Sequence, residues 1–418
     1  MAFKKLSFSL PESVESQLVT TVENWEGAGS TERIWQKDAA VWTNSGENKW
    51  LGWLNIAADE LAKLDEYRDL REDVAAAGFA DIVLMGMGGS SLGPEVLATT
   101  FGIENFHILD STVPAQVRSV EARVDLAKTL FIVASKSGTT LEPNCFMLYF
   151  FDRIATAVGR ESAGQHFIAI TDPGSKLEEE ARELGFRKII HGKPDVGGRF
   201  SALSPFGMAP AAVMGLDVES ILTRAAAMAA ECRNAAAAEN PGALLGIILG
   251  VCHAAGRDKL TIFASKELES LGAWLEQLIA ESTGKNGAAI IPIDGEAPQP
   301  TVSYGPDRVF VDIRLAGGNG ADVDLSALRA AGHPVLQIEM ADVSVIGAEF
   351  FRWEFATAAA GAVMGLNPFD QPDVEAAKIE TRSLTDAFES SGSLPDEETF
   401  FEAEGIKMFA SAEYAAHL

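Results

Sequence analysis

The sequence predicts an α/β fold in which each parallel sheet is flanked by helices. Short apolar segments of strand length alternate with longer helical segments along most of the chain, an order typical of a doubly wound parallel sheet. The segment 130–134 (LFIVA) is apolar throughout, as expected for a strand buried on both faces. With 418 residues, of which 47% are hydrophobic, the chain is long enough for two or three domains around a large core.

Composition argues against several classes of partner. The net charge of −27 disfavours binding to nucleic acid and to anionic membranes, because both would repel the protein. The longest uncharged apolar run, 242–255, is shorter than the ~20 residues that a membrane-spanning helix needs. The first residues also lack the apolar core of a signal peptide. The three cysteines, Cys145, Cys232 and Cys252, have no metal-ligand spacing, which indicates reduced thiols in a cytoplasmic protein.

The N-terminal segment, residues 1–75, is expected to be helical. An amphipathic helix is expected from Trp50 to about Val74. Most of the tryptophans lie in this segment: Trp25, Trp35, Trp42, Trp50 and Trp53. We expect them to pack in a helical cap on the next domain, although indole rings can also stack on a sugar.

Two α/β domains are expected to follow, at residues 76–216 and 217–390. The boundary falls at about 216–240, where alanine-rich helices begin. Strands are expected at 81–85, 106–110, 130–134, 166–171, 188–191, 260–264, 289–292, 307–313 and 334–339. The main helices are expected at 141–151, 220–240, 242–256, 268–280, 347–365 and 374–387. Residues 391–418, with a strand at 406–410, are expected to form a C-terminal extension that is truncated.

A hydroxyl-rich turn, Ser135 to Thr140 (SKSGTT), follows the apolar strand at 130–134 and opens a helix. A helix N-terminus leaves backbone N–H groups free and carries a partial positive charge, and the hydroxyls of the turn add donors. Gly138 permits close approach of the backbone to a ligand. The turn therefore predicts an anion site. The alternative is an ordinary helix N-terminus whose serines bind no ligand.

A glycine-rich turn, 86–94 (GMGGSSLGP), follows the strand at 81–85 in the same way. One alternative is the dinucleotide fingerprint of a nicotinamide enzyme, with Asp110 placed where an acid would bind the ribose. However, Ser91 occupies the position of the third glycine, and this reading leaves the turn at 135–140 unexplained.

A third turn, 196–201 (VGGRFS), places two glycines before Arg199. Arginine is a permanent cation whose planar guanidinium suits an oxyanion. The alternative for Arg199 is a plain salt bridge at the surface. If the ligand is a phosphate, such cations must act locally against the strongly negative charge of the whole chain.

Together with two later segments, these turns resemble the phosphoglucose isomerase family. The matching segments are 86–94 (GMGGSSLGP), 135–142 (SKSGTTLE), 196–201 (VGGRFS) and 281–285 (ESTGK) with 371–378 (QPDVEAAK). They follow the order of the family and cover roughly residues 80–380. The stretches WLGWL at 50–54, EFFRWE at 349–354 and NPFDQPDVEAAK at 367–378 are most similar to the isomerase half of fused transaldolase–phosphoglucose isomerase proteins.

The resemblance implies two sugar-isomerase (SIS-type) domains with an active site between them. By position, Ser135, Lys136, Ser137, Thr139 and Thr140 would hold the 6-phosphate, Gly89 and Ser90 would touch the substrate chain, and Glu142 would contact the sugar. Arg199 matches the arginine beside the reacting carbons, Glu281 the base, and Gln371 and Lys378 the residues near the phosphate and the ring oxygen. Lys136 is expected to steady its turn rather than donate a proton.

The implied reaction converts glucose-6-phosphate to fructose-6-phosphate without a metal or organic cofactor. One carboxylate, Glu281, moves a proton between C2 and C1 through a cis-enediol, and Arg199 stabilises the negative charge that develops. Binding of the phosphate orients the substrate. The alternatives without a role in catalysis are a surface acid for Glu281 and, for Lys378, an exposed ion pair with Glu375 one helical turn away.

One family feature has no counterpart here, the histidine motif that helps to open the sugar ring. None of the six histidines lies in such a motif, and His107 and His166 are expected to be ordinary core or edge residues. Ring opening is therefore left to Lys378, another group or spontaneous opening. Alternative functions are a dual phosphoglucose/phosphomannose isomerase and a sugar-phosphate-binding protein without turnover. The family resemblance also suggests a homodimer. The sequence contains no transaldolase part, and it leaves open whether a transaldolase partner or a further C-terminal segment completes the site.

Overall fold

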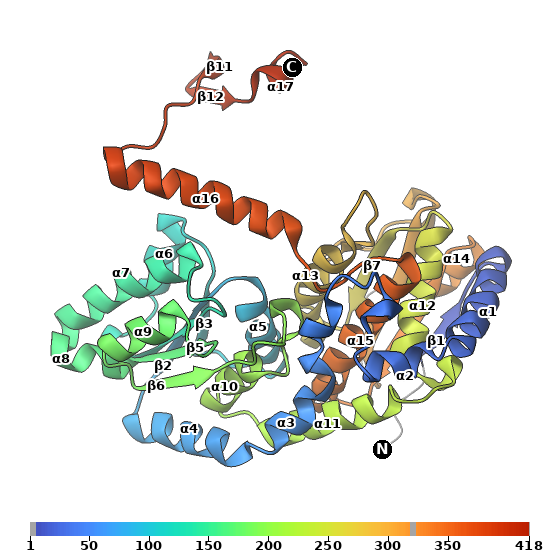
Figure 1. Ribbon diagram of the computed structural model, residues 1–418, viewed down its shortest axis with the longest axis horizontal. Helices are drawn as coiled ribbons and strands as arrows, with labels where there is room; N and C mark the ends of the chain where they lie inside the picture. The colour runs from blue at the N-terminus through green and yellow to red at the C-terminus, as the bar shows by residue number, and fades with distance from the viewer. Residues whose placement is uncertain (1–5, 318–322, 418) are drawn as a thin grey trace. The chain divides into compact units, whose positions relative to one another are not determined.

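The computed structural model describes residues 6–317 and 323–417. The chain forms two compact units, Met1–Phe369 and Asp370–Leu418, and each is described by itself. The first unit holds two five-stranded sheets, one built from the first half of the chain and one mainly from the second half (Figure 1). The mixed α/β class with parallel sheets flanked by helices, predicted from the sequence, is confirmed.

The first sheet is parallel throughout and has the strand order β3-β2-β4-β5-β6. Its strands are β2 (Asp81–Gly86), β3 (Phe106–Leu109), β4 (Thr129–Ala134), β5 (Phe167–Thr171) and β6 (Lys188–His191), each within two residues of its prediction. The order reverses between β2 and β4, where Gly86 pairs with Ala134. In open α/β sheets, ligands bind outside the carboxyl ends of the strands at such a reversal.

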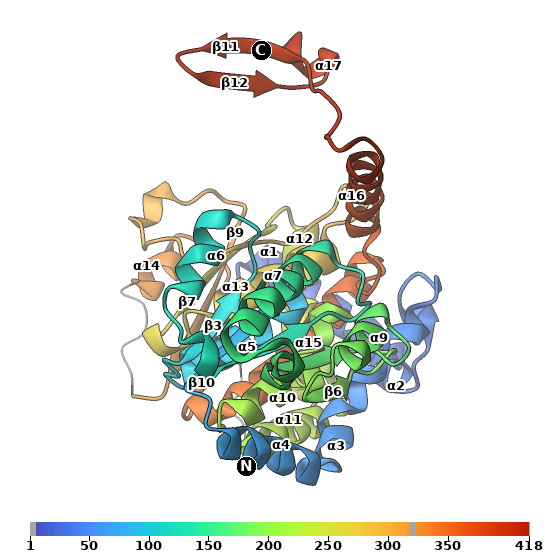
Figure 2. The ribbon, with the colours of Figure 1, turned by 90° about the vertical axis from the view of Figure 1, so that its left-hand side faces the viewer.

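Aromatic side chains hold the helices against one face of this sheet. Phe131 of β4 lies 4.9 Å from Phe150 of α7 (Leu141–Val158), and Phe167 of β5 lies 5.1 Å from Phe186, measured between ring centroids. Helix α7 packs against β2 and β4, and Figure 2 shows α7 between α6 and α9. The other helices of this half are α5 (Leu92–Thr100), α6 (Pro114–Glu121), α8 (Arg160–Ala163), α9 (Lys176–Glu183) and α10 (Pro205–Val213).

The second sheet has the order β1-β10-β9-β7-β8. The strands β7 (Lys259–Ala264), β8 (Ile291–Ile293), β9 (Arg308–Leu315) and β10 (Val335–Met340) are parallel and were predicted from their apolar segments. Strand β1 (Ser7–Ser9) was not predicted; it pairs antiparallel with β10 at the edge of the sheet. Three residues with one apolar side chain are too short to show a strand pattern.

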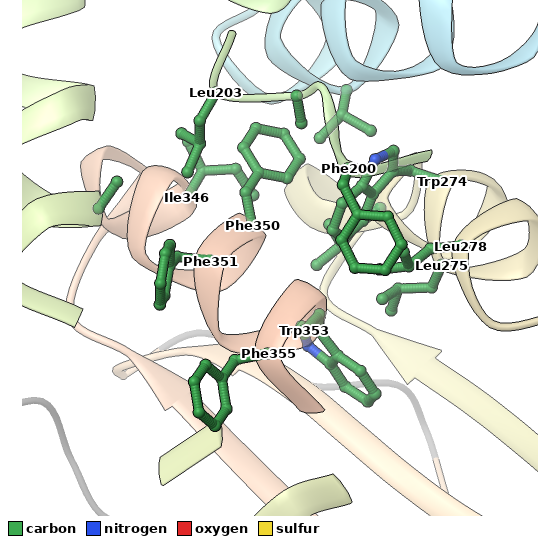
Figure 3. Close-up of a cluster of buried hydrophobic side chains, with 14 of the residues drawn as sticks. Phe200, Leu203, Trp274, Leu275, Leu278, Ile346, Phe350, Phe351, Trp353 and Phe355 are labelled. Carbon is green, nitrogen blue, oxygen red and sulfur yellow. The ribbon is translucent and has the colours of Figure 1, made fainter. Parts of the chain in front are cut away.

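Helix α15 (Ile346–Met364) runs through the core of the first unit and is buried along most of its length. Helices α11 (Val218–Glu231), α12 (Pro241–Ala254) and α13 (Leu271–Thr283) pack around it. Figure 3 shows Phe200 and Leu203 beside side chains of α13 and α15. This core joins the segment that carries Arg199 to helix α13, and it thereby positions the site described below.

The change of packing partner lies between α10 and α11. Helix α10 packs on α5 of the first half, whereas α11 packs on α15 of the second. A domain boundary near residue 216 remains an interpretation of this pattern. Two further helices, α5 and α13, pack on each other between the two sheets (Figure 1).

The N-terminal segment is helical but not as one amphipathic helix from Trp50 to Val74. It contains α1 (Glu12–Gly27), α2 (Ser30–Trp35), short 3-10 turns, α3 (Ile56–Leu61) and α4 (Leu64–Ala77). Leu51 forms a β-bridge to Val196, and the N–H of Gly52 donates to the carbonyl of Asp195. The backbone of residues 51–52 therefore pairs with a distant segment and does not continue a regular helix.

The tryptophans of the N-terminal segment pack in or against the hydrophobic core, as predicted. Trp25, Trp42 and Trp53 are buried, and the Trp53 ring lies 5.2 Å from the ring of Phe200. Trp42 donates its indole N–H to the carbonyl of Ala358 in α15 at 2.8 Å. These contacts tie the segment to the rest of the unit.

The second unit consists of α16 (Pro372–Ser391), the hairpin of β11 (Thr399–Ala403) and β12 (Ile406–Phe409), and α17 (Ala412–Ala415). The predicted helix at 374–387 and strand at 406–410 are confirmed, and β11 is additional. Glu404 and Gly405 form the two-residue loop and both have positive φ, as a type I′ turn requires. Within the described ranges, no helix is long and apolar enough to cross a membrane.

Candidate active site

The glycine-rich turn after β2 contacts the turn that carries Arg199. Gly88 has a φ of +54°, and Gly89 lies so close to Gly198 that a Cβ on Gly89 would overlap the Gly198 carbonyl. Ser201 donates its hydroxyl to the carbonyls of Gly89 at 3.2 Å and Gly198 at 2.6 Å. The glycines are therefore needed because two backbones meet here.

The hydroxyl-rich turn follows β4, the neighbour of β2. The hydroxyls of Ser137 and Thr139 lie 2.9 Å apart and both residues are exposed, while Ser135 donates to Thr140 at 3.5 Å. Thr140, the residue before α7, makes no side-chain cap with the first turn of the helix. Gly138 has a φ of +67° and lies against the backbone of Leu177. The geometry suits an anion at the N-terminus of an 18-residue helix.

Arg199 is buried, with 4% of its side chain exposed, so the reading as a surface salt bridge is wrong. Its Nη1 donates to the Ser282 hydroxyl at 2.5 Å and to the carbonyl of Pro368 at 2.8 Å. Its Nη2 donates to the carbonyl of Phe369 at 3.3 Å, and its Nε lies 3.3 Å from Oε2 of Glu281. The guanidinium plane is thus fixed from several sides.

Glu281 lies near the end of α13, and 35% of its side chain is exposed. Its Oε2 faces Arg199, and its Oε1 accepts a hydrogen bond from Nε2 of Gln277 at 3.1 Å. A carboxylate that is oriented on both oxygens and still reachable from solvent can act as a general base.

Gln277 was not singled out from the sequence. It precedes Glu281 by four residues, which places both side chains on one face of α13. The Gln277 amide also lies against Gly88, where an added Cβ would overlap it. The i, i+4 spacing was the only sequence signal for this residue, because its second contact comes from the first sheet.

The segment 367–369 supplies backbone carbonyls that accept hydrogen bonds from Arg199 and Lys285. Lys285 is buried and donates to the carbonyls of Asn367 at 2.6 Å and Ser282 at 3.2 Å. Asn367 in turn accepts the N–H of Phe369 on its side chain at 3.0 Å. The lysine of the ESTGK segment therefore fixes the Asn367 carbonyl, which directly precedes the two carbonyls that receive the Arg199 guanidinium.

The other candidate site residues predicted from the sequence are Ser90, Glu142, Gln371 and Lys378. Ser90 is in the turn with Gly89, and Glu142 is in the first turn of α7. Burial and, next, the charge of Glu142 raise the pKa of the Cys145 thiol. Gln371 precedes α16 and is exposed, and Lys378 is half-buried within that helix. Both belong to the second unit, and their assignment to the site remains a proposal.

Three histidines have partners in or beside the first sheet. His107 contacts Asp81 at 3.1 Å, His166 contacts the carbonyl of Thr129 at 2.9 Å, and His191 contacts Glu178 at 3.0 Å. The first two are the core or edge residues that were predicted. Among the residues that the structure describes, no His, Cys, Asp and Glu side chains form a group that could hold a metal ion.

Known proteins with similar sequences cover most of this chain. The family model for phosphoglucose isomerase matches residues 62–296. A glucose-6-phosphate isomerase of Rubrobacter xylanophilus is 30% identical over 367 residues, which cover 75% of this chain and 84% of that protein. A probable glucose-6-phosphate isomerase of Methanococcus maripaludis is 28% identical and covers 79% of this chain and 83% of that protein.

Solved structures show the same architecture. A hypothetical protein of Thermus thermophilus aligns with a TM-score of 0.75 and 26% identity over 90% of this chain and 99% of that one. A glucose-6-phosphate isomerase of Chlamydia trachomatis aligns with a TM-score of 0.72 and 22% identity over 88% of this chain and 86% of that one, which supports the fold. With the family model matched over more than half of its length, the chain belongs to the phosphoglucose isomerase family.

Proposed function

We propose that this protein is a glucose-6-phosphate isomerase, an aldose–ketose isomerase that interconverts glucose-6-phosphate and fructose-6-phosphate. One observation carries the proposal within the family: the Glu281 carboxylate is held between Gln277 and the buried Arg199, beside the glycine-rich turn. This arrangement presents one oriented base and one fixed cation side by side, as an enediol mechanism requires.

The phosphate end of the substrate is assigned to the turn after β4. The hydroxyls of Ser135, Ser137, Thr139 and Thr140, with the start of α7, supply donors for phosphate oxygens. Gly89, Ser90 and Glu142 are proposed to contact the sugar chain, and Gln371 and Lys378 to lie near the phosphate and the ring oxygen. Phosphate binding far from the reacting carbons orients them for proton transfer.

In the proposed reaction, Glu281 removes the C2 proton of the open-chain aldose. The C–H electron pair forms the C1–C2 double bond of the enediol, and negative charge develops on the C1 oxygen. Arg199, held rigidly by Ser282 and Pro368, stabilises that charge without having to reorganise. The proton of the C2 hydroxyl passes to the C1 oxygen, Glu281 returns its proton to C1, and C2 becomes the carbonyl. Ring opening is assigned to Lys378 or occurs spontaneously.

We also propose a cytoplasmic protein that works as a homodimer with a transaldolase as partner. The three cysteines are free thiols, with Cys145 exposed and Cys232 and Cys252 buried, which suits a reducing compartment. The partner and the dimer are supported by the resemblance of segments 50–54 and 367–378 to fused transaldolase–isomerase proteins.

The test is formation of glucose-6-phosphate from fructose-6-phosphate by wild type, Glu281→Gln and Glu276→Gln. The first substitution keeps the shape of the side chain but removes the base, so kcat should fall by about 10²–10⁴-fold. Glu276 is exposed on the same helix, and its substitution should leave kcat unchanged.

Mannose-6-phosphate, assayed in parallel, decides whether the C2 epimer is also a substrate. A wild type that binds fructose-6-phosphate without turning it over would contradict the proposal and would indicate a sugar-phosphate-binding protein of the same fold.

A further inference from the structure

The ammonium group of Lys136 is bound entirely by protein groups. Its Nζ lies 2.5 Å from Oδ2 of Asp172, 2.9 Å from the carbonyl of Lys193 and 3.3 Å from the carbonyl of Pro194. An ammonium has three N–H donors, and here three acceptors receive them. The lysine inside the hydroxyl-rich turn therefore points its donors at other parts of the protein, and a phosphate would have to displace one of these partners to bind it.

Asp172 is well placed to hold the lysine there. It directly follows β5, the neighbour of β4, and its N–H donates to the carbonyl of Lys136 at 3.1 Å. The preceding residue, Thr171, donates its hydroxyl to the carbonyl of Ser135 at 2.7 Å. Only 18% of the Asp172 side chain is exposed, and Gly192 lies against its second oxygen. The carboxylate is thus fixed to the same turn that carries Lys136.

The carbonyls that Lys136 holds belong to the segment leading to Arg199. Lys193 and Pro194 precede the turn at 196–201, and Lys193 accepts the N–H of Val196 at 3.1 Å as well. Lys136 therefore connects the turn proposed to bind phosphate with the backbone that delivers the Arg199 guanidinium. A sugar phosphate spans these two parts, so the separation between them decides whether C1 and C2 lie against Arg199 and Glu281.

We propose that Lys136 is a positioning residue rather than a direct phosphate ligand, and that Asp172 is the counter-ion that keeps it in this role. The pair fixes the distance between the hydroxyl-rich turn and the Arg199 segment. The effect on turnover rests on the proposed isomerase function, whereas the effect on the 193–201 segment does not. A misplacement of the reacting groups by about 1 Å is enough to cost roughly 10²-fold in rate.

The two roles of Lys136 predict opposite effects of Asp172→Asn. If Lys136 bound the phosphate directly, removal of the competing carboxylate would free its donors and tighten phosphate binding. If the pair positions the Arg199 segment, the same substitution loosens that segment and lowers kcat, as Lys136→Met does. Because both substitutions break one interaction, the double variant should be no worse than the worse single variant.

The experiment compares wild type, Lys136→Met, Asp172→Asn, the double variant and two controls. Lys128→Met and Asp65→Asn make the same charge changes at exposed side chains away from this pair. Four quantities are measured: kcat and KM for fructose-6-phosphate, the Kd for inorganic phosphate, and amide hydrogen exchange of 193–201. We expect kcat to fall by about 10²-fold in both single variants. The Kd for phosphate should change by less than about threefold, and exchange at 193–201 should quicken.

Other results overturn the proposal. A tenfold or greater weakening of phosphate binding in Lys136→Met, with kcat unchanged and tighter phosphate binding in Asp172→Asn, would make Lys136 a direct ligand. Unchanged exchange at 193–201 would remove the positioning role. If Lys136→Met does not fold, Asp172→Asn decides alone, because it retains the lysine. If the wild type shows no isomerase activity, the proposed function fails, and phosphate binding and exchange still test the pair.

Discussion

Nε of Arg199 lies 3.3 Å from Oε2 of Glu281, and the two residues come from different halves of the first unit. The arginine follows the first sheet and the glutamate ends a helix of the second half, so the pair exists only when both halves are folded together. Because each partner is also held by other groups, the distance between them is a fixed property of the fold.

Arg199→Lys should lower kcat by about 10²–10³-fold although the charge is kept. A lysine cannot reach Ser282, the two backbone carbonyls and Glu281 at once, because it lacks the planar fork of arginine. Steady-state kinetics measure the effect. Arg68→Lys, in exposed pairs with Asp65 and Glu219, is the control and should behave as wild type. A rise in KM with unchanged kcat would mean that Arg199 serves binding only.

Gln277→Leu should lower kcat roughly fivefold with little change in KM, since loss of one positioning hydrogen bond costs about 1 kcal/mol. The substitution frees Oε1 of Glu281 while leaving its bond to Arg199. Kinetics and a thermal melt of the same preparation separate this effect from unfolding. Gln116→Leu removes an exposed bond to Asp110 and serves as control. Equal kcat in wild type and Gln277→Leu would show that Arg199 alone orients the base.

Gly89→Ala should abolish most activity and destabilise the protein by about 1–3 kcal/mol. The new methyl group would overlap the carbonyl of Gly198, and a backbone cannot move aside as the end of a flexible side chain can. Gly197→Ala is a matched control in the partner turn, because nothing lies within 4 Å of its Cβ and its φ is −69°. Denaturant titration and kinetics test both. Similar behaviour of the two variants would contradict the close approach.

Glu354→Met should stabilise the protein by about 1–3 kcal/mol at pH 8. Glu354 is fully buried in α15, and neither carboxylate oxygen has a hydrogen-bond partner among the residues that the structure describes. Burial raises the pKa of this carboxyl well above its ordinary value of 4.5. A raised pKa in the folded state means that wild type loses stability as the pH rises above 4.5, where the unfolded chain ionises.

The advantage of Glu354→Met over wild type should therefore grow between pH 4.5 and pH 8. Urea titrations at several pH values measure it, with Glu231→Met, an exposed position at the end of α11, as control. An advantage that does not change with pH would mean that Glu354 has a polar partner in solution.

Most of the sheet architecture was predictable because its strands are continuous apolar runs. β2, β4, β5 and β7 are buried along almost their whole length and β9 and β10 along most of theirs, and their composition shows this directly. β1 was not predictable, because its position depends on the open edge of β10 rather than on its own side chains. The irregular backbone at Leu51 and Gly52, before α3, likewise depends on the distant segment at 195–196.

The candidate site divides in the same way. Arg199, Glu281 and the glycine turn were indicated by residue types in short motifs, and the structure brings them into contact. The roles of Asp172 and Lys285 were not, because each depends on a partner far away in the sequence, and Gln277 offered only its i, i+4 spacing to Glu281. These contacts can be identified only from the three-dimensional structure, which brings together the end of β5, the end of α13 and the segment 367–369.

The pairing of β1 with β10 also bears on how the chain is made. Ser9 is synthesised long before its partner Val335, because β10 lies near the end of the unit. The N-terminal residues must therefore wait unpaired while the first sheet folds. Until β10 is in place, the strand with which they pair does not yet exist. Completion of the second sheet on the ribosome is thus a late event, and in a nascent chain stalled before residue 335 the β1 segment has no strand to pair with and stays open to proteases.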